Sequence, residues 1–128
     1  MGYNSDVKIL MGLKAYEVLK STCEASENEY VREMVQKPSS LTIDSEANRV
    51  LIGWEWYKWY DGYEEIDAVE GVLNNLSEWV EEKPDEYPLK DYYYKQIRIG
   101  EDNATEEHTN DSYEEYVCDF YVTCQFSL

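Results

Sequence analysis

The sequence predicts one α+β domain over residues 1–128, a two-layer sandwich with two helical segments on one face of a mostly antiparallel sheet. Two observations predict it. Apolar residues alternate with period two in five segments and recur at helical spacing between them. The chain is also 43% hydrophobic, which is enough for a core at this length. The order β-α-β-β-α-β-β specifically predicts a ferredoxin-like β-α-β-β-α-β core with an extra C-terminal strand.

The first half begins with a strand and a helical unit. The alternation at 7–11 predicts the strand, although a helix starting at Ser5 is an alternative because Leu10 interrupts the pattern. Helical spacing then covers 13–23, and Ser26-x-x-Glu29 has the form of a capping box that starts a second helical turn. We expect that turn to bury Tyr30, Val31, Met34 and Val35.

A short strand at 41–43 and a long one at 50–60 follow, joined by a turn at 45–48. The long strand carries large aromatic residues on both faces, which predicts a central position in the sheet. Trp54 and Trp56 share a face with Val50 and Ile52, so both are expected in the core. Trp59 falls on the other face.

The second half predicts one long helix and two strands. Asp61 is the expected N-cap, and an apolar stripe ends before Pro84. A strand is expected at 92–99 and a loop at 100–112. The last strand, at 118–126, would place Cys118 and Cys124 on its apolar face, too far apart to form a disulfide if that strand is straight.

The net charge of −17 lies mostly in the second half, where residues 65–128 contribute −13. Acidic tails that stay unfolded are usually poor in aromatic residues, whereas this chain is 15% aromatic. A folded domain with a strongly negative surface follows, and such a surface attracts basic partners. Its acids and two flanking tyrosines are the candidate partner-binding residues: Glu78, Glu81, Glu82, Glu101, Asp102, Glu106, Glu107, Asp111, Tyr113, Glu114, Glu115 and Tyr116.

Catalytic signatures are missing from the sequence. The single histidine, His108, lies in an acidic segment, and no phosphate-binding loop, dinucleotide fingerprint or zinc motif occurs. We therefore expect a protein that is not an enzyme and has no cofactor and no dedicated metal site, with weak binding of a divalent cation by the acidic segment 101–107 left open. The odd number of cysteines and the lack of a signal peptide or membrane span predict a cytoplasmic protein, in the host cytoplasm if phage-encoded.

In size, charge and compactness the chain resembles the small acidic DNA-mimic proteins that phages use against restriction enzymes and CRISPR nucleases. The resemblance implies an anti-CRISPR or anti-restriction inhibitor whose partner is a nuclease or another basic nucleic-acid-binding protein, with no direct contact to nucleic acid or membrane. A homodimer is left open.

The alternative is a non-enzymatic protein-interaction or structural module that binds through exposed aromatic residues. Its candidate anchors are Tyr57, Trp59, Tyr63, Tyr92, Tyr93, Tyr94, Tyr113 and Tyr116.

Overall fold

The computed structural model describes residues 3–82 and 89–110, which form an α+β arrangement. Its helices and strands are, in chain order, β1 (Ser5–Met11), α1 (Leu13–Glu24), α2 (Glu29–Gln36), β2 (Ser40–Asp44), β3 (Arg49–Tyr57), α3 (Glu64–Glu82), a 3-10 turn η1 (Leu89–Tyr92), β4 (Tyr94–Gly100) and β5 (Thr105–Thr109). The predicted α+β class is confirmed.

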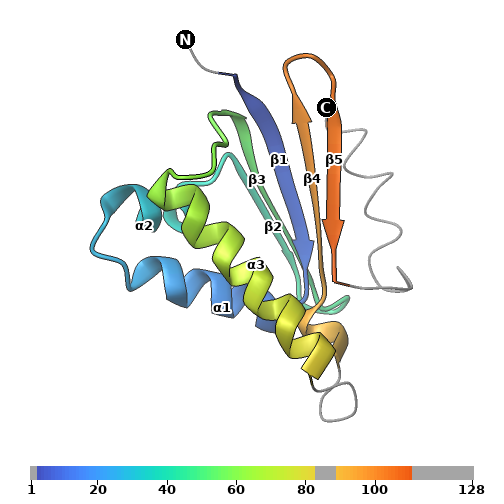
Figure 1. Cartoon of the computed structure of the whole chain (residues 1–128). Helices are drawn as coiled ribbons and strands as arrows, with labels where there is room; N and C mark the ends of the chain where they lie inside the picture. Colours follow the sequence, from blue (N-terminus) through green and yellow to red (C-terminus); the bar gives the residue numbers. More distant parts are fainter. Residues whose placement is uncertain (1–2, 83–88, 111–128) are drawn as a thin grey trace.

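The five strands form one sheet in the order β2-β3-β1-β4-β5, and every neighbouring pair is antiparallel. Figure 1 shows α1, α2 and α3 on the same face of this sheet. The strands β1 and β3 are therefore central, as the aromatic residues on both faces of β3 predicted. Among the described residues no helix is long and apolar enough to cross a membrane.

The core lies between the sheet and the helices. Alternate residues of β1 and β3 point toward the helices, and the apolar stripe of α3 packs on them. The indole of Trp54 is buried, and its Nε1–H donates to the carbonyl of Met34 in α2 at 2.9 Å. Fully buried side chains of this core include Val7, Ile9, Met11, Leu19, Ile52, Ile66, Leu73 and Leu76.

Two predicted helix starts differ from the structure. Asn28, and not Ser26, is the N-cap of α2, and its side chain accepts from the Tyr30 N–H at 2.8 Å. In the helix that follows this N-cap, Tyr30 is exposed, contrary to expectation, while Val31, Met34 and Val35 are buried as expected. Helix α3 begins at Glu64 and not directly after Asp61.

The predicted loop at 100–112 is wrong, because it contains β5. This strand carries only Thr, Glu and His residues, so no apolar alternation shows it in the sequence. Its stability comes instead from backbone pairing with β4 and from ion pairs across the two strands. The strand expected at 118–126, with Cys118 and Cys124, lies outside the described residues.

The face of the sheet opposite the helices is also apolar near its centre. Leu10 and Ile97 are buried there, and Leu51, Tyr93 and Ile99 pack against them. Lys8 and Lys95 occupy the same face by strand alternation and are nearly as buried. The second face of the central strands is thus not a simple polar surface.

Candidate functional site

The candidate site begins at an irregularity in the central strand pair. Ser5 pairs with Tyr57 and Val7 pairs with Trp54, so two residues of β3 lie opposite the single residue Asp6. This is a β-bulge, a feature that re-aims side chains and is common beside functional sites. Trp56, at the bulge, has φ of 53°, in the left-handed region that a bulky side chain rarely adopts.

Side chains satisfy the backbone donors that the bulge leaves free. Asp6 Oδ1 accepts from the Trp56 N–H at 2.7 Å, and Ser39 Oγ accepts from the Glu55 N–H at 2.8 Å. The carboxylate of Asp6 therefore holds Trp56 in its unusual conformation.

The bulge reverses the predicted roles of two tryptophans. Trp56, expected in the core, is 65% exposed, whereas Trp59, expected as a surface anchor, is 2% exposed. The Trp59 Nε1–H donates to Glu70 of α3 at 2.9 Å, and its ring lies 5.2 Å from that of Trp54. The extra residue in β3 shifts the alternation by one, which moves every later side chain to the other face.

Acidic and aromatic side chains gather at this end of the sheet, where β1 begins and β3 and β4 end. We call it the strand-end surface. Segments 3–6, 55–63 and 98–106 meet here and carry six acids and two bases, Lys58 and Arg98. Its main side chains are Tyr3, Asp6, Glu55, Trp56, Tyr60, Tyr63, Glu101, Asp102 and Glu106.

The N-terminal segment joins the parts of this surface. The Tyr3 N–H donates to the Tyr60 hydroxyl, and the Tyr3 hydroxyl donates to Asp102. That second hydrogen bond raises the pKa of Tyr3 and lowers the pKa of Asp102. A Cβ at Gly100 would collide with the Tyr3 ring, so glycine lets the segment cross the β4–β5 hairpin. The hydrogen bond from the Tyr3 hydroxyl therefore keeps the Asp102 carboxylate ionised.

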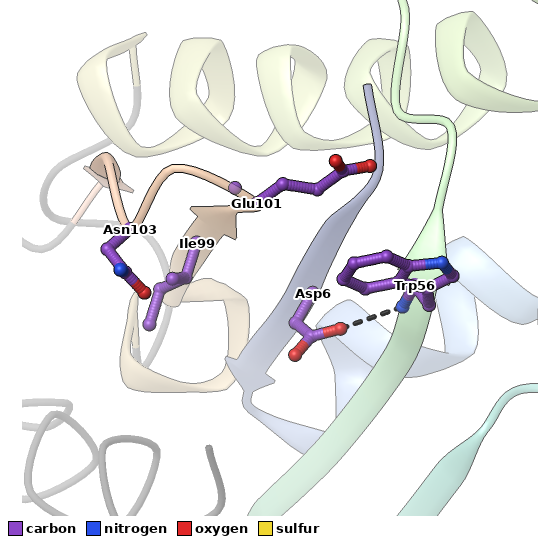
Figure 2. Close-up of a pocket in the computed structure, with 6 residues that line it drawn as sticks. Asp6, Trp56, Ile99, Glu101 and Asn103 are labelled. Atoms are coloured by element: carbon purple, nitrogen blue, oxygen red, sulfur yellow. Dashed lines mark hydrogen bonds between the residues drawn. The ribbon is translucent and has the colours of Figure 1, made fainter. Parts of the chain in front are cut away.

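A shallow recess of about 170 Å³ opens on this surface, lined by Asp6, Trp56, Ile99, Gly100, Glu101 and Asn103. Figure 2 shows the indole of Trp56 beside Asp6, with Glu101, Ile99 and Asn103 contributed from the β4–β5 side. Asp6 and Ile99 are directly paired across β1 and β4. The recess thus joins one exposed aromatic ring, one apolar side chain and two carboxylates.

Both carboxylates of the recess are fixed by backbone donors. Glu101 Oε1 accepts from the Asn4 N–H at 2.7 Å, just as Asp6 Oδ1 accepts from Trp56. In the described part of the chain, the second oxygen of each carboxylate accepts no further hydrogen bond. Each residue therefore presents one oriented, negatively charged oxygen atom.

The sequence-predicted acids reach this surface only in part. Glu101, Asp102 and Glu106 lie on it and are exposed. Glu106 pairs with Arg98 at 3.8 Å, and Glu107 pairs with the buried Lys95 at 3.8 Å. The sequence lacks basic residues after Arg98, but the antiparallel register places Arg98 directly opposite Glu106 and Lys95 diagonally across from Glu107.

The remaining predicted residues lie elsewhere. Glu78 is exposed on α3, close to the start of β4, because the neighbouring Ser77 Oγ lies 3.1 Å from the Tyr94 hydroxyl. Glu101 follows the far end of β4, so the two acids lie at opposite ends of a strand about 20 Å long. Glu81 and Glu82 form the last turn of α3, and their side chains are not described. Outside the described residues lie Asp111, Tyr113, Glu114, Glu115 and Tyr116.

Several predicted aromatic anchors are structural. Burial raises the pKa of Tyr57 to about 12, and its hydroxyl donates to Glu65 at 3.2 Å. Tyr94 is buried, and burial raises its pKa. Tyr92 is half-buried with its ring 5.8 Å from that of Trp79, and Tyr93 packs on the helix-free face. Tyr63 is exposed, beside Tyr60.

Five residues that line the recess were not predicted as site residues, namely Asp6, Trp56, Ile99, Gly100 and Asn103. Within the described residues no group of three or more His, Cys, Asp or Glu side chains could hold a metal ion. Comparison of the chain with protein families, curated proteins and solved structures finds no match.

Proposed function

We propose that the protein is a non-catalytic inhibitor that binds a basic protein, such as a nuclease or another nucleic-acid-binding protein, through the strand-end surface. It would act in the cytoplasm by DNA mimicry or by blocking the surface that holds nucleic acid, as a phage-type anti-CRISPR or anti-restriction protein. The observation that carries this proposal is the gathering of acids around an exposed tryptophan on one surface.

Charge and aromatic contact act together in this proposal. Carboxylates aligned on one surface speed association with a basic partner, and a desolvated tryptophan supplies binding energy after contact. Trp56 is more exposed than the other tryptophans in the described residues. The aromatic interaction module and the acidic inhibitor therefore use the same surface.

The proposal also includes the finer fold. The strand order β2-β3-β1-β4, with α1 and α2 between β1 and β2 and α3 between β3 and β4, supports a ferredoxin-like two-layer sandwich with β5 added at the β4 edge. In that arrangement the strand-end surface lies at the end of the sheet where β1 begins and β4 turns into β5 (Figure 1).

The test is capture of partners from a bacterial lysate on the immobilised protein, followed by elution with duplex DNA. We expect nucleic-acid-binding proteins to be retained and then released by DNA at constant ionic strength, because the two ligands compete for the same groove. Each identified nuclease is then assayed for inhibition. Retention that DNA does not affect would contradict mimicry.

A pair of charge variants locates the contact. The triple variant E101Q/D102N/E106Q removes three charges from the strand-end surface, and E17Q/E27Q/E46Q removes three from exposed positions elsewhere. We expect the first variant to associate more slowly with the captured partner and the second to bind nearly as the wild type. Equal loss in both variants would show that only net charge matters.

A further inference from the structure

The recess on the strand-end surface has a size and chemistry that define what can enter it. Its volume of about 170 Å³ is below the roughly 300–1,000 Å³ of pockets that enclose drug-sized ligands. A nucleotide or a sugar chain is therefore too large, whereas the end of one side chain fits. Two carboxylates also disfavour any anion.

We propose that the recess binds one arginine side chain of the basic partner, with its guanidinium group on the face of Trp56 and hydrogen-bonded to Asp6 and Glu101. This proposal rests on the proposed function and names the group that the partner inserts. Arginine suits the recess because its planar guanidinium stacks on aromatic rings and donates to two carboxylates at once.

The geometry of the carboxylates supports this assignment. Backbone N–H groups of Trp56 and Asn4 each hold one oxygen of Asp6 and Glu101, at 2.7 Å in both cases. The other oxygen of each remains to accept from a ligand. Because these oxygens are fixed before binding, a guanidinium group loses little free energy to ordering of the site.

Trp56 supports it independently of the charges. A bulky residue in the left-handed region is strained, and such strain is usually found where function requires the conformation. Packing among the described residues offsets little of this strain, because the side chain is 65% exposed. The strained backbone places the indole beside two carboxylates. This placement suits a cation, because among aromatic rings the face of tryptophan binds cations most strongly.

The test uses N-acetyl-arginine amide, with N-acetyl-citrulline amide as a neutral ligand of nearly the same shape. The indole N–H signals of the four tryptophans are followed by NMR, and the Trp56 signal is assigned with W56F. We expect the arginine ligand to shift the Trp56 signal saturably and the citrulline ligand to shift it far less. The signals of the buried Trp54 and Trp59 should stay in place.

The double variant D6N/E101Q removes both charges but keeps an amide oxygen to accept from each backbone N–H. We expect it to weaken arginine binding about tenfold, from the loss of two ion pairs. The matched variant E17Q/E46Q, with the same net charge, should bind as the wild type. An unmoved Trp56 signal, or equal affinity of the two variants, would overturn the proposal.

The outcomes separate this inference from the proposed function. If arginine does not bind the recess but captured partners are still released by DNA, the inhibitor function stands and the recess is not its anchor. If arginine binds as expected but no nucleic-acid-binding protein is captured, the recess recognises an arginine of another class of protein.

Discussion

At the scale of single residues, Asp6 and Trp56 depend on each other. The Asp6 carboxylate accepts from the Trp56 N–H and so stabilises a conformation that a tryptophan would otherwise avoid. Asp6 thus supplies one of the two charges of the recess and also fixes its aromatic wall. A conservative change at either position can therefore separate stability from binding.

Replacement of Trp56 by glycine tests this separation. Glycine adopts positive φ without strain, so W56G should leave the free energy of unfolding unchanged or raise it by about 1 kcal/mol, while binding of arginine is lost. Urea denaturation measures the first, and an NMR titration that follows the backbone amide signals of the recess measures the second. As a control, T42G in β2, where φ is not positive, should lower the free energy of unfolding by about 1 kcal/mol. A loss of more than 1 kcal/mol in W56G would mean that Trp56 serves the fold.

At the scale of elements, the acids of α3 are not all exposed charges that a partner could contact. Glu70 accepts from the Trp59 indole N–H at 2.9 Å and from the Gln96 amide at 3.0 Å. It therefore joins α3 to the chain beyond β3 and to β4. Residues with the same charge in one helix thus have different roles.

We expect E70A to lower the free energy of unfolding by about 1–3 kcal/mol, because two largely buried donors lose their acceptor. E70Q keeps one acceptor oxygen and should cost less. E78A, at an exposed position of the same helix, should change stability by less than about 0.5 kcal/mol. Urea denaturation of the three variants decides the matter, and equal costs for E70A and E78A would refute the structural role of Glu70.

Pairing across the β4–β5 hairpin gives another element-scale prediction. Lys95 is buried and pairs with Glu107, whereas Arg98 and Glu106 are more exposed. Removing a partner from a buried charge costs more than removing one from an exposed charge. We expect E107Q to cost about 1 kcal/mol more than E106Q in urea denaturation. The reverse order would show that Lys95 does not depend on Glu107.

The sequence predicted the elements whose apolar spacing is regular, including β1, α1, β2 and the buried stripe of α3. It could not locate the bulge, because an insertion in one strand depends on the register of its partner. The predicted locations of Trp56, in the core, and of Trp59, on the surface, are therefore the reverse of those in the structure. Strand β5 escaped prediction because its side chains are polar on both faces, and its pairing is set by the β4–β5 turn.

The candidate site was predicted less completely than the fold. Charge density pointed to Glu101 and Asp102, and both are exposed in the structure. Asp6 was missed because a lone acid in an apolar strand has no periodic signal, and only its partner in β3 explains it. The separation of Glu78 from Glu101 likewise follows from the direction of α3 along the sheet (Figure 1).

At the scale of the whole molecule, the pH dependence of stability follows from groups that burial keeps protonated. Burial raises the pKa of Cys23 to about 11 and that of Tyr57 to about 12. Both groups ionise at lower pH in the unfolded chain than in the folded protein. Their contribution to the free energy of unfolding is therefore complete below about pH 9 and is lost as pH rises toward 11–12.

We therefore expect the urea midpoint to fall steadily between pH 9 and pH 10.5. Y57F should reduce the part of the decline above pH 10, because phenylalanine cannot ionise and leaves the buried ring in place. A pH profile of Y57F that parallels the wild type would show that Tyr57 does not contribute.

Strand β2 forms an outer edge of the sheet, and its Leu41 and Ile43 side chains are 41% and 51% exposed. An open edge with apolar side chains is a template on which a second chain can add a strand. The charge of −17 opposes that encounter, because two copies repel each other before their edges meet. The acidity that we propose as the attraction for a basic partner would therefore also protect the protein from its own sheet edge, and concentrated salt should remove this protection.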